Sequence, residues 1–323
     1  MASRVLSGLI ASLLTIVCTV QMSSAQQWPS RTVRVVVPYG AGGVTDIMAR
    51  VTADRLGKIF HQSFIVENKP GAGGELGVSY AMHAPQDGYT ILFVGSTMFT
   101  VLPLTRKVGY APLKDLVPVS ITGTNGMVMV VRKDSPWATL RDFIQYVKAN
   151  PGKVTYSSGG TGTNNHLDSA YFAGLEKLNM VHVPFTGGQA ALTAVLSKTV
   201  DMHFGNSSDV VEPVRNGLVK GLAVSTPERM PQLPDVPTVA ETVPGFKYVA
   251  WNGYAVTGGV PQEVITRLAH ALQTVAKDPE VVERFSKLGI DSVGGTPEEA
   301  VASLRKDMPV YSDMVDMAGI RMK

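Results

Sequence analysis

The chain has 323 residues, a formal net charge of +3, 45% hydrophobic residues and 17% charged residues. This composition excludes a wholly disordered protein, and the near-neutral charge without a long Lys/Arg run excludes nucleic acid as the main partner. The length fits two domains, and a single cysteine excludes both a disulfide framework and a cysteine-based metal site.

The N-terminus is typical of a secretory signal peptide. Arg4 precedes an uncharged, largely apolar run over residues 5–20, and small residues precede a cleavage site after Ala25. The apolar run is shorter than the ~20 residues that a bilayer-spanning helix needs. Removal of residues 1–25 leaves 298 residues without cysteine, because Cys18 belongs to the signal. We therefore expect a periplasmic protein, and thiol catalysis is excluded in its mature chain.

After the signal, short β-rich runs alternate with helical periodicity, which is the α/β pattern. Strands are predicted at residues 33–37, 64–66, 89–94, 127–131, 154–156, 181–183, 202–204, 222–224 and 248–256. Helices are predicted from residue 44 to 60, after the glycines at 71–74, over 140–148, after residue 163, after residue 188, and through most of 263–317.

The predicted elements form two interleaved lobes. No low-complexity linker divides the chain, so we place the crossings between lobes near residues 121–131 and 247–254. The first lobe is then expected to hold residues 26–126 and 250–323. The second lobe is expected to hold residues 127–249.

Four glycine-rich loops, each between a predicted strand and a helix, are the main functional signal. They occupy residues 39–46, 70–74, 157–163 and 185–189. Glycine lets a ligand approach the backbone closely, and the helix start behind it supplies unpaired N–H groups and a positive dipole end. Such a loop is an anion site, and the first, third and fourth loops contain no Lys or Arg. Hydroxyl donors are expected from Thr45, Ser157, Ser158, Thr161 and Thr163. The alternative for any single loop is a tight turn without a ligand.

Other chemistries fit less well. The sequence has neither a phosphate-binding Gly-Lys-Ser/Thr motif nor a complete dinucleotide fingerprint. Asp46 is interpreted either as a helix-terminus acid or as a ligand contact through water, a hydroxyl or an amine. His166 and Asp168 are two residues apart and do not share a helix face, which disfavours a metal pair. A triad of these two with Ser157 is also disfavoured, because no nucleophile elbow is present.

Several motifs in this order resemble one protein family. The motifs are WPSR (28–31), VRVVV (33–37), PYGAGGVTD (38–46), NKPGAGG (68–74), PQDGYT (85–90), GTGT (160–163) with HL (166–167), and VPFTGG (183–188). Together they resemble the periplasmic substrate-binding proteins of tripartite tricarboxylate transporters, the Bug or TctC family. The resemblance covers essentially the whole mature chain.

The resemblance implies a type II periplasmic binding protein, or Venus flytrap, whose two lobes close on a small carboxylate. It implies recognition by backbone N–H groups, Ser/Thr hydroxyls and water, with no cofactor or metal. Membrane transporter subunits are the implied partners, and we expect a monomer. The ligand remains open among dicarboxylates, tricarboxylates, aromatic carboxylates and amino acids. The alternative functions are a periplasmic enzyme acting on a carboxylic acid, with Asp46 as its base, or a sensory receptor for a two-component system.

The loops and the resemblance together predict a set of ligand-binding residues. The set is Tyr39, Gly40, Ala41, Gly42, Gly43, Thr45, Asp46, Ser96, Thr97, Ser157, Ser158, Gly160, Thr161, Gly162, Thr163, His166, Phe185, Thr186, Gly187, Gln189, Asn206 and Trp251. Ser96, Thr97, Phe185, Gln189, Asn206, Ser207 and Trp251 are candidates for the far end of the ligand.

Overall fold

A computed structural model describes residues 27–246 and 248–323. The predicted signal peptide, residues 1–25, lies outside the described residues. Within the described ranges, none of the helices combines the length and the apolar character that crossing a bilayer requires.

The first lobe is built on a six-stranded mixed sheet with the order β11-β4-β10-β3-β1-β2. Its strands are β1 (Val33–Val37), β2 (Phe64–Asn68), β3 (Thr90–Gly95), β4 (Leu116–Asn125), β10 (Ala250–Thr257) and β11 (Ile290–Ser292). Strand β1 runs parallel to β2 and β3, whereas β10 is antiparallel to both β3 and β4. The helices are α2 (Val44–Phe60), α3 (Glu75–Met82), α4 (Val101–Thr105), α9 (Gln262–Ala276) and α10 (Pro279–Lys287).

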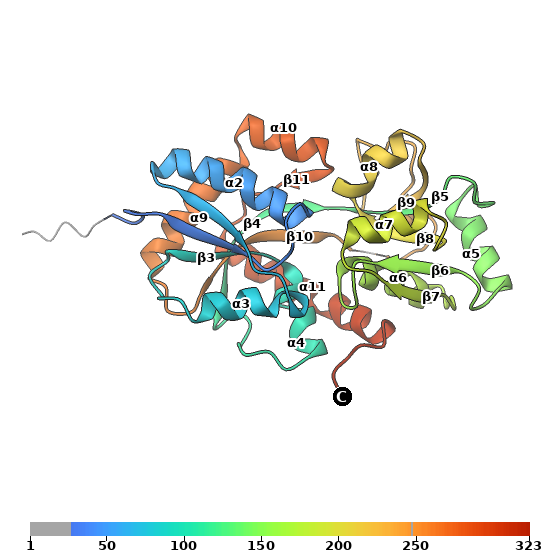
Figure 1. Cartoon of the computed structure of the whole chain (residues 1–323), viewed down its shortest axis with the longest axis horizontal. Helices are drawn as coiled ribbons and strands as arrows, with labels where there is room; N and C mark the ends of the chain where they lie inside the picture. Colours follow the sequence, from blue (N-terminus) through green and yellow to red (C-terminus); the bar gives the residue numbers. More distant parts are fainter. Residues whose placement is uncertain (1–26, 247) are drawn as a thin grey trace, which may run out of the picture.

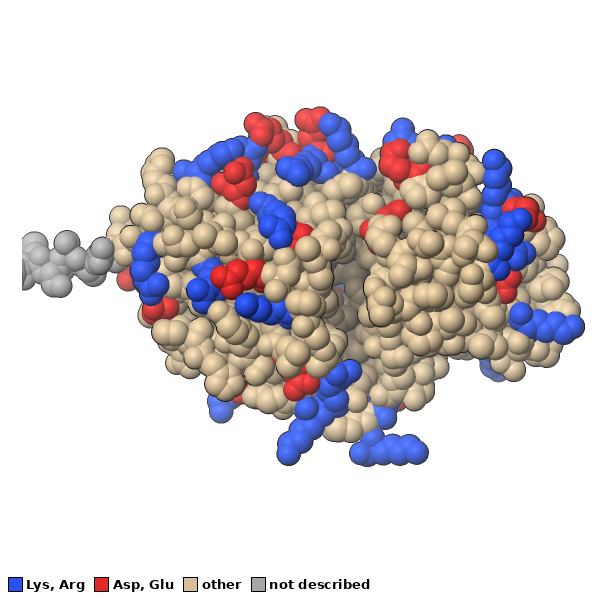
Figure 2. Space-filling model, viewed as in Figure 1, with Lys and Arg blue, Asp and Glu red and all other residues tan. Residues whose placement is uncertain are grey.

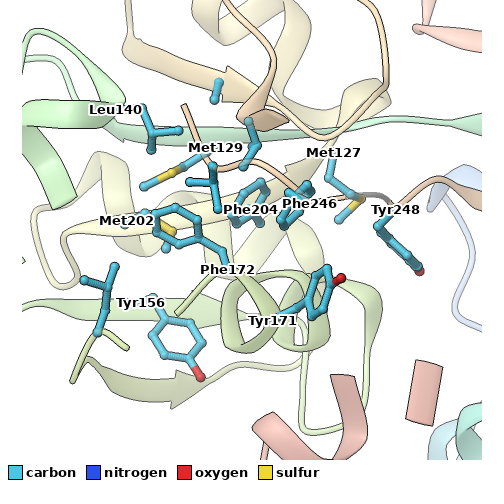
Figure 3. Packing of buried hydrophobic residues seen from close by; sticks show 14 of the residues in the cluster. Met127, Met129, Leu140, Tyr156, Tyr171, Phe172, Met202, Phe204, Phe246 and Tyr248 are labelled. Carbon is cyan, nitrogen blue, oxygen red and sulfur yellow. The ribbon is translucent and has the colours of Figure 1, made fainter. Parts of the chain in front are cut away.

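The second lobe is built on a five-stranded sheet with the order β7-β6-β8-β5-β9. Its strands are β5 (Met127–Arg132), β6 (Thr155–Ser158), β7 (Val181–Pro184), β8 (Met202–Asn206) and β9 (Val219–Val224). The helices are α5 (Leu140–Ala149), α6 (Asn164–Leu175), α7 (Gly188–Leu196) and α8 (Ser207–Arg215). Methionines and aromatic rings fill the space between this sheet and its helices (Figure 3).

The chain passes between the lobes through two neighbouring strands. Strand β4 of the first sheet leads through Gly126 into β5 of the second sheet, and the chain returns just before β10. Figure 1 shows the two lobes side by side, with the long helix α11 (Pro297–Met317) running beneath both. Near its start, Leu304 packs into the first lobe, while Tyr311 and Met314 pack into the core of the second. The lobe boundaries at residues 126/127 and 249/250 remain a prediction about which parts move together.

The α/β class and the two-lobe fold predicted from the sequence are confirmed. The structure adds strand β4, which carries Pro118 and Gly123 and therefore gives a weak strand signal, and helices α4 and α8. The expectation that residues 263–317 are mostly helical is also corrected, because the short strand β11 separates α10 from α11. Pairing of β11 with the edge of β4 explains this strand, and such tertiary pairing leaves little trace in a three-residue sequence.

Candidate functional site

A cavity of about 760 Å³ lies between the two lobes. In Figure 2 a deep groove separates the halves of the molecule, and the surface along much of its rim is uncharged. The first lobe contributes residues 38–46, Pro70, Gly71, Gly73, Gly74, Gly95, Thr97, Met98, Val101, Leu102, Thr105, Arg106 and Asn252. The second lobe contributes Gly159, 161–165, 186–189, Asn206 and Asp209, and Ile320 follows α11.

In the first lobe, the loop before α2 is held by a carboxylate. Gly42 has a φ of +84°, which favours glycine, and its N–H donates to Asp46 Oδ2 at 2.9 Å. Arg50 binds both oxygens of the same carboxylate at 3.0 Å, and Asn68 Nδ2 donates to Oδ1 at 2.9 Å. Burial alone would raise the pKa of Asp46, but the hydrogen bonds from Arg50, Gly42 and Asn68 outweigh it and lower the pKa. Asp46 is thus an ionised residue that orders the loop.

In the second lobe, the loop before α6 is held by an imidazole in the equivalent position. Gly162 has a φ of +81°, and its N–H donates to His166 Nδ1 at 3.3 Å. The His166 ring stacks on His182 at 3.9 Å between centroids, and His182 Nε2 lies 2.7 Å from Ser158 Oγ. Burial, with a smaller effect of His182, lowers the pKa of His166 to about 4. The imidazole is therefore neutral at pH 7 and accepts at Nδ1.

Both helix starts behind these loops lack a capping side chain. Gly43 precedes α2 and has no side chain, while Thr163 precedes α6 and donates its hydroxyl backward to the Gly160 carbonyl at 2.7 Å. The first N–H groups of a helix have no partner within the helix, so these ends keep free donors and a partial positive charge. Two helix ends with free N–H donors, one from each lobe, therefore border one cavity.

A chain of polar side chains crosses from lobe to lobe along the cavity. Thr45 Oγ1 donates to Asn252 Oδ1 at 2.9 Å, and Asn252 Nδ2 donates to Asn125 Oδ1 at 3.2 Å. Asn125 Nδ2 then donates to Asn206 Oδ1 at 3.3 Å. Asn252 and Asn125 belong to the crossing strands β10 and β4. The Thr45 hydroxyl donates its proton to Asn252 in this series of hydrogen bonds, so it is not the free donor predicted from the sequence.

The cavity wall contains three charged residues, which differ in their pairing. Asp46 is neutralised by Arg50. Arg106, at the end of α4, donates from Nη1 to the Ala72 carbonyl at 3.0 Å. Within the described residues, no ion pair involves Arg106 or the third charge, Asp209 in the first turn of α8.

Most of the sequence-predicted residues are brought together in this wall. They are Tyr39, Gly40, Ala41, Gly42, Gly43, Thr45, Asp46, Thr97, Thr161, Gly162, Thr163, Thr186, Gly187, Gln189 and Asn206. Tyr39 OH lies 3.4 Å from Thr97 Oγ1, so the two form one patch of the first lobe. Their contact with a ligand remains a prediction.

The predicted serines lie outside the wall, because their hydroxyls bond within the protein. Ser157 Oγ donates to the Ala191 carbonyl at 3.0 Å, and Ser158 Oγ pairs with His182. Both are fully buried at the end of β6. Ser96 pairs with Tyr311 of α11, and Ser207 Oγ donates to the Gly289 carbonyl at 2.9 Å. All four serine hydroxyls therefore have partners within the protein, either backbone carbonyls or the side chains of Tyr311 and His182.

Four further predicted residues are also displaced from the wall. Gly160 uses its carbonyl to hold Thr163, and His166 lies behind the loop as its acceptor. Phe185 packs against the second-lobe core. Trp251 is 3% exposed and lies 6.0 Å, centroid to centroid, from Phe99.

The sequence reasoning missed Asn252, Arg106 and Asp209. Successive residues of a strand point to opposite faces, so the placement of Trp251 in the core directs its neighbour Asn252 to the cavity. Strand alternation was the signal for Asn252. Nothing local distinguishes Asp209 from an ordinary acid in a first helical turn, or Arg106 from a surface arginine.

Comparisons with known proteins agree with this geometry. A family model described as "Tripartite tricarboxylate transporter family receptor" (TctC) matches residues 48–308. Protein BugT of Bordetella pertussis is 30% identical over 303 residues, covering 93% of each chain. An R. palustris protein solved with adipate superposes with a TM-score of 0.85 at 28% identity, covering 91% of this chain and 99% of that one. MatC from Rhodopseudomonas palustris with bound malate gives a TM-score of 0.82 at 30% identity, covering 89% and 100%.

Proposed function

Because the chain belongs to the tripartite tricarboxylate transporter receptor family, whose members are periplasmic binding proteins, we propose that it captures a small carboxylate between its lobes and delivers it to transporter subunits in the membrane. The observation that carries this proposal is the pair of uncapped helix ends, α2 and α6, on opposite sides of one cavity. A carboxylate that accepts from both ends favours the closed arrangement of the lobes over the open one.

The charges around the cavity support a carboxylate held by backbone groups. The loops at residues 40–45 and 159–165 contain no Lys or Arg. The relatives solved with adipate and malate bind dicarboxylates, which makes dicarboxylates the first ligands to test. We further propose that residues 1–25 direct export and that the receptor acts as a monomer.

A binding role also fits the chemistry of the wall better than catalysis. The enzyme alternative needs a general base with a pKa near the working pH. Asp46, the base considered from the sequence, has a lowered pKa. Both of its carboxylate oxygens accept hydrogen bonds, which come from Gly42, Arg50 and Asn68. We therefore propose a receptor that releases its ligand unchanged.

The test is a ligand screen on the purified mature protein, residues 26–323. Thermal unfolding is measured with mono-, di- and tricarboxylates, and positive ligands are then titrated by calorimetry. We expect at least one carboxylate to raise the melting temperature and bind saturably, and to be recovered unchanged after incubation. A protein that binds no carboxylate of the panel, or that converts its ligand, would contradict the proposed function.

A further inference from the structure

Asp209 is a carboxyl group in the cavity wall without a cationic partner among the described residues. Its hydrogen-bond partners are neutral side chains: Ser208 Oγ donates to Oδ1 at 3.2 Å, Asn206 Nδ2 lies 3.5 Å from Oδ2, and the Gln189 side chain contributes as well. Gly188 packs against the same oxygen so closely that a Cβ there would lie 2.9 Å from Oδ2. Asn206, Gly188 and Asp209 all line the cavity, so the carboxyl group belongs to the binding surface.

The position within α8 explains how the protein tolerates this group. Asp209 lies in the first turn, where the helix dipole favours a negative charge. The dipole of a nine-residue helix does not replace an ion pair, and burial raises the pKa of Asp209 despite the hydrogen bonds from Asn206, Ser208 and Gln189. The start of α7, at Gly188, also lies beside the carboxyl group, but no cationic side chain among the described residues forms an ion pair with it.

A carboxyl group without an ion pair is a disadvantage in a cavity that binds carboxylates. It repels an anionic ligand unless the ligand itself carries a positive group at that point. The wall also contains Arg106 on the opposite lobe, which has no carboxylate partner in the part of the chain that the structure describes. A ligand with charges of both signs can pair with both residues. A simple dicarboxylate can pair with Arg106 and the helix ends, but it is repelled by Asp209.

We infer that Asp209 is a specificity-determining residue that accepts from an ammonium group, so that the preferred ligand is an amino-substituted carboxylate. This inference rests on the proposed function and narrows its ligand class. The helix ends bind a carboxylate of the ligand, and Asp209, which belongs to the second lobe, binds the ligand's ammonium group. Ligands of the same length without the amino group bind more weakly.

The experiment compares matched pairs of ligands by calorimetry: succinate with L-aspartate, glutarate with L-glutamate, and adipate with 2-aminoadipate. L-Malate tests whether a hydroxyl replaces the ammonium group. The proteins are the wild type, Asp209→Asn and the control Glu212→Gln, which removes an exposed acid from the same helix. In the best-binding pair we expect the wild type to prefer the amino ligand by about tenfold or more, as for a hydrogen bond between charged groups. Asp209→Asn abolishes this preference by weakening the amino ligand alone, and Glu212→Gln preserves it.

Three results would overturn the inference. The wild type could bind both members of every pair equally, or Asp209→Asn could weaken both members equally. A preference for L-malate over L-aspartate that disappears in Asp209→Asn would show that Asp209 accepts from a ligand hydroxyl and not from an ammonium group. Asp209→Ser, also compatible with a helix start, repeats the test if Asp209→Asn lowers the melting temperature without ligand. If no probe binds to any protein, the inference fails, whereas the proposed function fails only if the full panel of mono-, di- and tricarboxylates also shows no binding.

Discussion

The two loops that meet at the cavity share one design and differ in one chemical detail. Each has a glycine with a φ near +80° whose N–H donates to the side chain four residues later, from Gly42 to Asp46 and from Gly162 to His166. Each is followed by a helix start without a capping side chain. The first lobe uses a carboxylate balanced by Arg50, whereas the second uses a neutral imidazole.

This difference shows how a carboxylate can order a loop next to a helix start without leaving a net negative charge there. An unpaired Asp46 would weaken the positive end of α2, but Arg50 restores the balance. The second loop needs no such compensation, because a neutral His166 orders it without adding charge. We therefore expect the helix end of α6 to be the stronger anion site, and the end of α2 to depend on an intact ion pair.

The largest effect is expected from the glycines themselves. Gly42→Val and Gly162→Val place a β-branched residue at a positive φ, which costs roughly 2 kcal/mol or more in the loop. Each variant should lose at least about tenfold in carboxylate affinity, because the helix end is no longer presented correctly. Gly152→Val, at a φ of +73° and outside the cavity wall, is the control for backbone strain alone. Unchanged calorimetric affinity in both Gly42→Val and Gly162→Val would show that the turns do not form the site.

The next effect separates the two acceptors. Asp46→Asn removes a nearly buried carboxylate that accepts from Gly42, Arg50 and Asn68, and should lower the free energy of unfolding by about 1–3 kcal/mol. Denaturant unfolding of the ligand-free protein measures this change. His166→Gln keeps a neutral acceptor, so a smaller loss is expected. A larger loss from His166→Gln than from Asp46→Asn would contradict the view that the first loop depends more on its side-chain acceptor than the second loop does.

Two threonines test which hydroxyl is free. Thr161 lines the cavity, and its hydroxyl has no protein partner among the described residues, so Thr161→Val should weaken carboxylate binding by about 1–2 kcal/mol without changing stability. The Thr45 hydroxyl donates to Asn252, so Thr45→Val should lower the unfolding free energy by about 1 kcal/mol and change binding less. The prediction fails if Thr161→Val binds its ligand as tightly as the wild type.

The smallest effect is a pH dependence confined to the second loop. Because the pKa of His166 is about 4, protonation at Nδ1 opposes the Gly162 N–H only as the pH falls through that value. The affinity for a carboxylate bound at this loop should be about twofold lower at pH 4, when half of the imidazole is charged, than at pH 7. The pKa of Asp46 is lowered, which keeps the first loop intact under milder acid. His166→Gln cannot titrate, so identical pH profiles for the variant and the wild type between pH 7 and pH 4 would contradict the proposal.

The same histidine makes the folded protein less stable in acid. Its native pKa of about 4 lies below the value of 6.5 in the unfolded chain, so the unfolded chain binds the proton first. Stability is therefore full above pH 6.5 and falls as the pH decreases from 6.5 to 4. Below pH 4 this group causes no further loss.

Individual strands and helices could be predicted well from the sequence, whereas contacts between residues far apart in the chain could not. The strand at residues 33–37 and the helix from Val44 follow from β-branched residues and helical periodicity, and both are present. The direction of a hydroxyl is different, because Ser157 and Ser158 find acceptors on α7 and β7, far along the chain. Asp209 enters the cavity through the packing of α8 beside α7, which no local pattern encodes.

A crystal structure of a carboxylate complex would test the central claim most directly. We expect a ligand carboxylate to accept, directly or through one water, from backbone N–H groups at the starts of both α2 and α6, at about 2.7–3.2 Å per hydrogen bond. Lys and Arg side chains should not contact that carboxylate. A ligand anchored by Arg106 alone, with neither helix end within hydrogen-bonding reach, would contradict the account.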